Sequence, residues 1–93
     1  MSYELVFTDS YTRRAVRFLR RHPELRAQYQ KTLELLELNP FHPALRLHKL
    51  KGSLGNLHAV SINFAYRIAI LFLVEGKSIL PVDVGSHDDV YSR

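Results

Sequence analysis

Cysteine is absent from this chain of 93 residues, and so are long apolar runs. Without cysteine there can be no disulfide framework, no thiol nucleophile and no thiolate-ligated metal, a composition typical of a reducing compartment. The strongest apolar run, Ile68 to Val74, is far shorter than the roughly 20 residues that span a bilayer. The first residues, which include Glu4 and Asp9, lack the basic and apolar regions of a signal peptide. The sequence therefore predicts a cytoplasmic protein that makes no contact with a membrane.

Internal repeats, low-complexity tracts and linkers are lacking as well. A chain of this length can bury well over half of the surface of its unfolded state, but it has no room for a second core. Residues 1–93 are therefore expected to form a single domain.

Positive charge is present in excess and is unevenly distributed. The chain carries a formal net charge of +4, and its pI is near 9.7. Residues 11–51 hold ten lysines and arginines against three glutamates, a net charge of +7. Such a basic stripe attracts polyanions, with nucleic acid first and an acidic protein second. A solvated, arginine-rich helix face is the alternative interpretation.

The hydrophobic pattern of the first half predicts a strand followed by two helices. Residues 3–8 alternate as in a strand, and Asp9 or Ser10 can cap the helix that follows. A second helix is expected to begin at Pro23 and to end at Asn39, and the short link makes the two helices a hairpin. The expected buried positions are Tyr11, Ala15, Phe18 and Leu19 in the first helix, and Leu25, Tyr29, Leu33 and Leu36 in the second.

In the second half the period changes from helical to extended. Four strands are predicted, at Leu45–Gly52, Asn56–Asn63, Tyr66–Val74 and Ser78–Val84, and their short connections require antiparallel pairing. Pro81 cannot donate to a ladder, so it is expected at an edge or a bulge. The predicted fold is α+β with the order β-α-α-β-β-β-β, a helical hairpin packed on a curved, mostly antiparallel sheet.

Polar side chains within the predicted strands are candidates for function. If the loop before Tyr66 holds an even number of residues, His58 and Arg67 share a sheet face, whereas an odd number separates them. Arg67 would be costly to leave unpaired inside a strand, so it should point to an anion. A lone strand histidine is more often structural, and this alternative stays open for His58. His48 lies beside Lys49 and is the stronger candidate.

The chain ends in VGSHDDVYSR, directly after the last predicted strand. Gly85 allows the chain to turn, so that His87 and Tyr91 project from the end of the sheet. The tail is thus either a polar cap on the strand or a carrier of functional side chains.

Three segments together resemble one protein family. LHKLKGSLG, SINFAYRIAILF and VDVGSHDDVYSR are similar to the pattern H-x-L-x-G, Y-R-I and G-x-H-x-x-V-Y of the RelE/ParE superfamily of bacterial toxins, and most similar to its YafQ-like branch. The order of strand, helical hairpin and C-terminal sheet also matches that family. The resemblance covers essentially the whole chain and implies a RelE-like fold.

The resemblance also implies roles for individual residues. His87 stands where the YafQ-like branch has its principal catalytic histidine, and His48 stands where it has another active-site histidine. Arg67 matches the arginine of the Y-R motif, and Tyr91 matches the terminal aromatic residue.

Other positions depart from the pattern of the family. Ala65 stands where the YafQ-like branch has an aspartate, and Ser61 where it has a further histidine. The central strand lysines of RelE are met only by His58 and Val60. These departures leave activity, substrate preference and mechanism open to difference from those relatives.

The implied chemistry is RNA cleavage without a metal or other cofactor, by attack of a ribose 2′-hydroxyl on the adjacent phosphate. This step needs a base, an acid and positive charge on the developing dianion. His48 or a neighbouring lysine is the expected base and His87 the expected acid, while Arg67 holds the phosphate. Tyr91 is expected to stack on a base or orient the phosphate. The expected RNA- and phosphate-binding residues are Lys49, Lys51 and His58. Asp88 and Asp89 keep a metal site open as the weaker option.

The implied function is that of the toxin of a type II toxin–antitoxin system, an endoribonuclease that cuts mRNA on the ribosome. Its implied partners are mRNA, the ribosome and an acidic cognate antitoxin. Two alternatives remain: a ParE-like toxin that binds DNA gyrase without catalysis, and a basic interaction domain that has lost activity.

Overall fold

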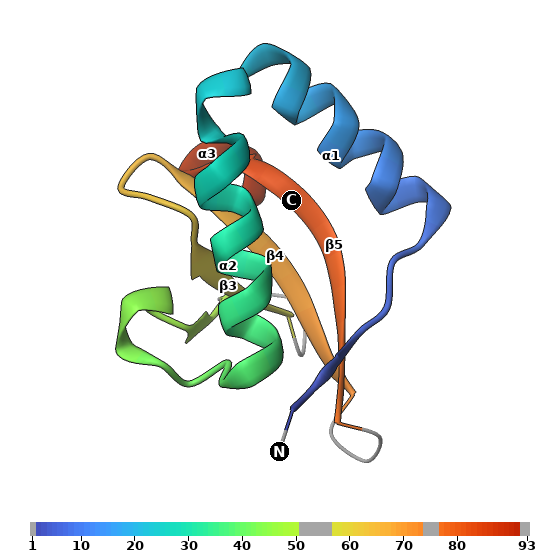
Figure 1. Cartoon of the computed structure of the whole chain (residues 1–93), viewed down its shortest axis with the longest axis vertical. Helices are drawn as coiled ribbons and strands as arrows, with labels where there is room; N and C mark the ends of the chain where they lie inside the picture. Colours follow the sequence, from blue (N-terminus) through green and yellow to red (C-terminus); the bar gives the residue numbers. More distant parts are fainter. Residues whose placement is uncertain (1, 51–56, 74–76, 92–93) are drawn as a thin grey trace.

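The chain forms a five-stranded sheet with a helical hairpin on one face and a short helix on the other (Figure 1). This structure is a computed structural model that describes residues 2–50, 57–73 and 77–91. The elements in chain order are β1 (Glu4–Leu5), α1 (Asp9–Arg21), a 3-10 turn (Pro23–Leu25), α2 (Arg26–Leu38), a second 3-10 turn (Pro43–Leu45), β2 (His48–Lys49), β3 (Leu57–Ser61), β4 (Tyr66–Leu73), β5 (Ser78–Ser86) and α3 (His87–Tyr91).

The two long helices pack on the sheet through the predicted apolar positions. Thr8 caps α1, since its hydroxyl accepts a hydrogen bond from the Tyr11 backbone N–H at 3.1 Å. The predicted stripe residues of both helices are buried or partly buried in the larger core cluster. The expectation that Asp9 or Ser10 is the cap is wrong by one or two positions, because both lie inside the helix.

The sheet has the strand order β1-β5-β4-β3-β2. β2, β3, β4 and β5 pair antiparallel, and β1 pairs parallel with β5, so the prediction of a mostly antiparallel sheet is confirmed. The β4–β5 ladder shifts register between Ala69 and Ile70, and Pro81 pairs with Ile70 directly beside this bulge. The predicted place for Pro81 is therefore confirmed.

Two separate cores cover the two faces of the sheet. The larger cluster lies between the sheet and the helical hairpin and includes Val60, Ile68 and Val84. The smaller cluster consists of Leu50, Ala59, Ala69 and Val90, and Val90 comes from α3. The second face is thus covered in part by α3, which contacts β4 and β5.

Several predicted boundaries are wrong. The first strand is only Glu4–Leu5. Helical structure does begin at Pro23 as predicted, but residues 23–25 form a 3-10 turn, and the α-helix itself spans Arg26–Leu38. Leu45 lies in another 3-10 turn, so among the described residues the next strand is only His48–Lys49, and Gly52 lies outside them. The last strand continues past Val84 to Ser86, and the tail forms the helix α3, which the predicted order lacks.

Candidate functional site

The loop between β3 and β4 determines which side chains share a face of the sheet. Ile62 donates its backbone N–H to the Tyr66 carbonyl at 2.9 Å, which leaves three residues, 63–65, in the loop. Asn63 closes this loop, because its side-chain oxygen accepts the N–H groups of Ala65 and Tyr66, each at 2.9 Å. The odd loop length pairs Arg67 with Ser61, so Arg67 and His58 lie on opposite faces.

Arg67 lies in a row of three paired residues across the sheet, Ser61 on β3, Arg67 on β4 and Gly85 on β5. One guanidinium nitrogen donates to the Ser61 hydroxyl at 2.6 Å. The Arg67 Nε is buried and has no hydrogen-bond partner within the described ranges. A buried, unpaired N–H of a cation is costly, so this group favours a bound anion.

A cavity of about 220 Å³ opens beside Arg67. Arg46 also lines it, so two arginines border one space, with Ser61 and Phe64 at the same cavity. Phe64 is 93% exposed at the tip of the β3–β4 loop. Two arginines beside an exposed aromatic ring match the phosphate and base of a nucleotide. Neither Arg46 nor Phe64 was identified from the sequence.

His48 lies on the same face of the sheet as Arg67. It pairs with Ala59, which pairs with Ala69, two residues from Arg67 along β4. At standard sheet spacings the Cα atoms of His48 and Arg67 are about 12 Å apart, a gap that two long side chains can span toward one ligand.

The hydrogen bond of His48 fixes its tautomer. The His48 Nδ1 is 2.9 Å from the Arg46 carbonyl oxygen, which can only accept, so Nδ1 carries the hydrogen. In the neutral ring, the lone pair then lies on Nε2. Arg46 places this carbonyl from a left-handed backbone conformation with a φ of 51°, a region that non-glycine residues seldom adopt.

His87 is the first residue of α3 and its side chain is 59% exposed. Its Nδ1 is 3.7 Å from an Asp88 carboxylate oxygen. Ser86 and Asp89 cap this helix reciprocally: the Asp89 N–H donates to the Ser86 hydroxyl and the Ser86 N–H donates to the Asp89 carboxylate, each at 3.2 Å. The motif S-x-x-D was the sequence signal for this helix, which follows β5 directly.

The structure brings only some of the predicted site residues together. Lys49 pairs with His58, which places both on the face opposite Arg67 and His48. The His58 ring contacts Phe72 edge-on, with ring centroids 5.2 Å apart. Their role in RNA binding remains a prediction. Lys51 and the side chain of Tyr91 lie outside the described part of the chain.

The described residues contain no group of three or more histidines, aspartates or glutamates close enough to hold a metal ion. Within the same ranges, none of the helices has both the length and the apolar character needed to cross a membrane.

Comparison with known proteins identifies the fold. No protein-family model and no curated protein sequence matches this chain significantly. Solved structures do match over nearly its whole length. A chain of the DinJ–YafQ toxin–antitoxin complex of Escherichia coli has a TM-score of 0.76 at 13% identity, covering 98% of this chain and 99% of that chain.

Two further structures have the same fold. The YoeB/ParE toxin of Agrobacterium tumefaciens has a TM-score of 0.71 at 18% identity, covering 90% of this chain and 98% of that one. A chain of the RelBE2 toxin–antitoxin complex of Mycobacterium tuberculosis has a TM-score of 0.60 at 15% identity, covering 94% and 100%. The chain therefore has the fold of the RelE/ParE toxins, as its sequence motifs predict.

Proposed function

We propose that this chain, which has the fold of the RelE/ParE toxins, is the toxin of a type II toxin–antitoxin pair and cleaves mRNA on the ribosome without a metal. The observation that carries the proposal is the cavity lined by Arg46 and Arg67, two cations that border one space, with Ser61 and the exposed Phe64 beside them. A phosphate in this cavity would pair with the accessible guanidinium nitrogens of the two arginines. His48 lies on the same sheet face and supplies a base.

In this mechanism, His48 Nε2 removes the proton of a ribose 2′-hydroxyl while that oxygen attacks the adjacent phosphorus. Arg67 and Arg46 stabilise the negative charge that develops on the phosphate oxygens. His87 donates a proton to the departing 5′-oxygen. The products are a 2′,3′-cyclic phosphate and a 5′-hydroxyl end. Histidine suits both proton transfers because its ordinary pKa lies near 6.5.

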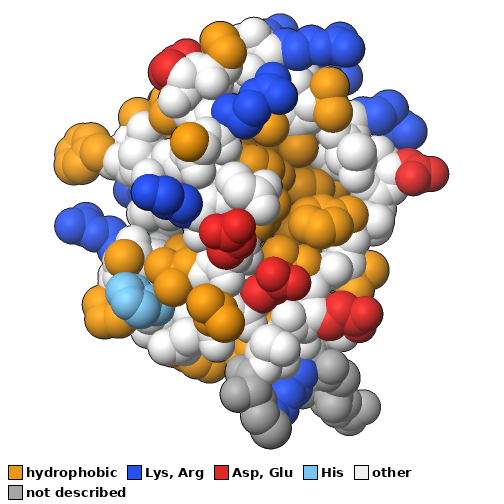
Figure 2. All heavy atoms as spheres, viewed as in Figure 1, with side chains coloured by type: hydrophobic (Ala, Val, Ile, Leu, Met, Phe, Trp, Pro, Cys, Tyr) orange, Lys and Arg blue, Asp and Glu red, His pale blue; other side chains and the backbone are white. Residues whose placement is uncertain are grey.

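The partners follow from charge and from the neighbours in fold. Two of the similar structures are toxin–antitoxin complexes. The arginines of α1 and the net charge of +7 over residues 11–51 favour an acidic antitoxin segment. Figure 2 shows basic side chains gathered over the upper part of one face, where α1 and the start of α2 lie in Figure 1. Lys51, Tyr91, Lys49 and His58 remain proposed contacts to RNA.

Mapping of RNA ends on translating ribosomes tests the nuclease proposal. The wild-type protein should create new 5′-hydroxyl ends, and His87→Ala, which lacks the acid, should lower the cleavage rate by about 10²- to 10⁴-fold. Arg67→Lys should also lower the rate, because lysine keeps the charge but loses the planar fork that pairs with phosphate. His42→Asn is the matched control. In the wild type the Ala44 N–H donates a hydrogen bond to the His42 ring, and the asparagine side chain also offers an acceptor for it. Its cleavage rate should equal that of the wild type.

Growth of an expressing strain separates the rival functions. Induction should arrest growth, and co-expression of an acidic antitoxin should relieve it. Full cleavage by His87→Ala would rule out His87 as the acid. Growth arrest without any RNA cleavage, together with binding to DNA gyrase, would establish the ParE-like function instead. If the protein neither cleaves RNA, nor arrests growth, nor binds gyrase, the inactive interaction domain is the remaining function.

A further inference from the structure

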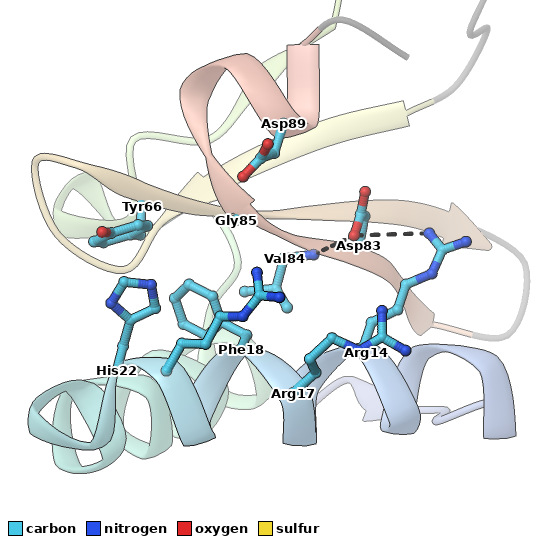
Figure 3. A pocket seen from close by; sticks show the side chains of 10 residues that line it. Arg14, Arg17, Phe18, His22, Tyr66, Asp83, Val84, Gly85 and Asp89 are labelled. Carbon is cyan, nitrogen blue, oxygen red and sulfur yellow. Dashed lines mark hydrogen bonds and ion pairs between the residues drawn. The ribbon is translucent and has the colours of Figure 1, made fainter.

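A second basic cavity, which shares no lining residue with the cavity beside Arg67, lies between α1 and β5 (Figure 3). Its volume is about 490 Å³, within the range of about 300 to 1,000 Å³ usual for small-ligand sites. Arg14 and Arg17 rise from α1 toward β5, where Asp83 and Gly85 face them, and Asp89 of α3 lies beyond. We call this space the α1–β5 groove, and its remaining lining residues are Phe18, Arg21, His22, Tyr66 and Val84.

The groove exists because β1 covers only the first part of β5. β1 pairs with β5 only at Ser78 and Ile79. Further along, α1 lies beside β5, and a guanidinium nitrogen of Arg14 donates to the Val82 carbonyl at 3.4 Å. The same nitrogen is 3.7 Å from the Asp83 carboxylate. Arg14 is therefore engaged in holding α1 against the strand.

Arg17 and Arg21 are differently placed. They follow Arg14 at i+3 and i+7, so the three arginines share one face of α1. Both are exposed, and neither has an ion pair or a side-chain hydrogen bond within the part of the chain that the structure describes. Arg17 and Arg21 therefore line the cavity without forming an ion pair to any carboxylate in the described part of the chain.

The two carboxylates of the groove have partners of their own. Asp83 is near Arg14 and also accepts the Val84 N–H at 2.9 Å. Asp89 accepts the Ser86 N–H in the cap of α3. Three arginines against two aspartates leave one excess positive charge. The groove is thus suited to a ligand with one negative charge, such as a phosphodiester.

Aromatic rings form the other end of the groove. The ring centroids of His22 and Tyr66 are 4.6 Å apart, and the Phe18 ring lies 4.8 Å from His22 and 5.3 Å from Tyr66. His22 and Tyr66 are only partly buried, so their rings are accessible from the cavity. The rings are tilted against one another by 40° to 71°, so they form an uneven aromatic wall. The accessible rings offer a contact for a base, and the two arginines beside them offer a contact for a phosphate.

We propose that the α1–β5 groove binds one nucleotide of single-stranded RNA outside the cleavage site, with its phosphate on Arg17 and Arg21 and its base against His22 and Tyr66. Tyr66 and Arg67 are consecutive on β4 and point to opposite faces. The RNA would therefore pass around the end of the sheet from one face to the other. This inference rests on the RNA-binding role proposed above, but it concerns affinity and can be measured without cleavage.

Fluorescence anisotropy with a labelled single-stranded RNA that carries 2′-O-methyl groups tests the groove, because this probe cannot be cleaved. The double variant Arg17→Ala/Arg21→Ala should bind about tenfold more weakly at 0.1 M salt, and its salt dependence should fall by about 0.7 in log–log slope, the value for one lost phosphate contact on single-stranded RNA. Arg13→Ala/Arg20→Ala removes the same charge from α1 outside the groove and is the matched control. It should keep a slope near that of the wild type. His22→Ala should weaken binding without changing the slope, and melting temperatures verify folding.

Each outcome decides the inference. If the two double variants lost RNA affinity equally, the loss would come from the overall charge of α1, and the groove would not be a binding site. Unchanged RNA binding with lost antitoxin binding would make it a protein-docking site. A wild-type protein that does not bind the probe would also overturn it. RNA binding through the groove without cleavage on ribosomes would refute the nuclease proposal alone, whereas cleavage with normal binding by Arg17→Ala/Arg21→Ala would refute only the groove.

Discussion

The hydroxyl groups of Tyr11 and Tyr29 join α1 to α2 within the larger core. Their oxygens are 2.6 Å apart, and both side chains are buried. Burial raises the pKa of Tyr11 well above the usual range for tyrosine, and burial raises the pKa of Tyr29 as well. The pair is stable as two neutral hydroxyls, one of which donates a hydrogen bond to the other, so that each buried oxygen has a partner.

This pair predicts a loss of stability at alkaline pH. In the unfolded chain the tyrosines release their protons near pH 10, whereas the folded pair retains them. The stabilisation is therefore fully present below about pH 10 and declines as the pH rises further. Urea unfolding at pH 8 and pH 10.5 should show a larger fall in the free energy of unfolding for the wild type than for Tyr11→Phe/Tyr29→Phe. Equal falls would contradict the assignment. At pH 8, Tyr29→Phe alone should cost about 1–3 kcal/mol, because the Tyr11 hydroxyl loses its partner.

The sequence alone did not determine which strand residues share a face of the sheet with Arg67. The motif around Arg67 predicted a strand arginine directed at an anion, and the structure places Arg67 beside a cavity with an unpartnered Nε in the described ranges. The length of the β3–β4 loop could not be predicted from the sequence NFAY. Asn63 can either end the strand or close a turn with its side chain, as it does in the structure. Because the loop has three residues rather than two or four, His58 lies on the face of the sheet opposite Arg67.

At the scale of elements, α3 depends on a close approach to β5. A Cβ added at Gly85 would lie 2.9 Å from both the Asp89 Cβ and a carboxylate oxygen of Asp89. The absence of a side chain at this position lets α3 turn back onto the sheet, where Val90 joins the smaller core. Gly85 therefore serves close packing between strand and helix, rather than a loose turn after the strand.

Gly85→Ala should displace α3 from the sheet. Because the Asp89 Cβ is part of the helix and cannot rotate away, the free energy of unfolding should fall by about 1–3 kcal/mol, as for other overpacked sites. Hydrogen exchange should become faster at α3 amides than in the wild type, with the amides of α2 unchanged. Ser86→Ala is the control, since it removes one capping hydrogen bond without a steric clash and should cost about 1 kcal/mol. Unchanged exchange in α3 of Gly85→Ala would show that the helix adapts.

The elements differ in how far their sequences determine them. α1 and α2 were predictable because their apolar residues recur at helical spacing and both helices contribute these residues to the larger core on one sheet face. β2 was predicted too long, because Leu45 enters a 3-10 turn that buries it against the core. α3 was missed because five residues are too few to show a helical period. Its signal was the capping pair Ser86 and Asp89.

At the scale of the whole molecule, the two candidate sites lie at different places around the sheet. Arg67 and His48 lie on the α3 face, whereas the α1–β5 groove lies along β5 and is lined by arginines of α1 and by Asp89 of α3. The excess positive charge of residues 11–51 is shared by both sites, because it includes Arg46 beside Arg67 as well as the arginines of α1. The sequence predicted the attraction to polyanions. The division of the charge between two sites depends on the strand pairing and on the short length of β1, which the sequence did not predict.

The last prediction concerns the source of the positive charge that stabilises the transition state. The arginines beside the candidate site, Arg46 and Arg67, and a protonated His87 supply it in the proposed mechanism. Cleavage of naked RNA should therefore persist in excess chelator, at a rate within about twofold of the rate in magnesium, measured beside a metal-dependent ribonuclease that loses its activity. Raising the salt concentration should slow cleavage by weakening RNA binding, since each phosphate contact contributes about 0.7 to the log–log slope. Activity that disappears with chelator and returns with one particular metal would instead assign the charge to a bound cation, and the roles of Arg46 and Arg67 in catalysis would be wrong.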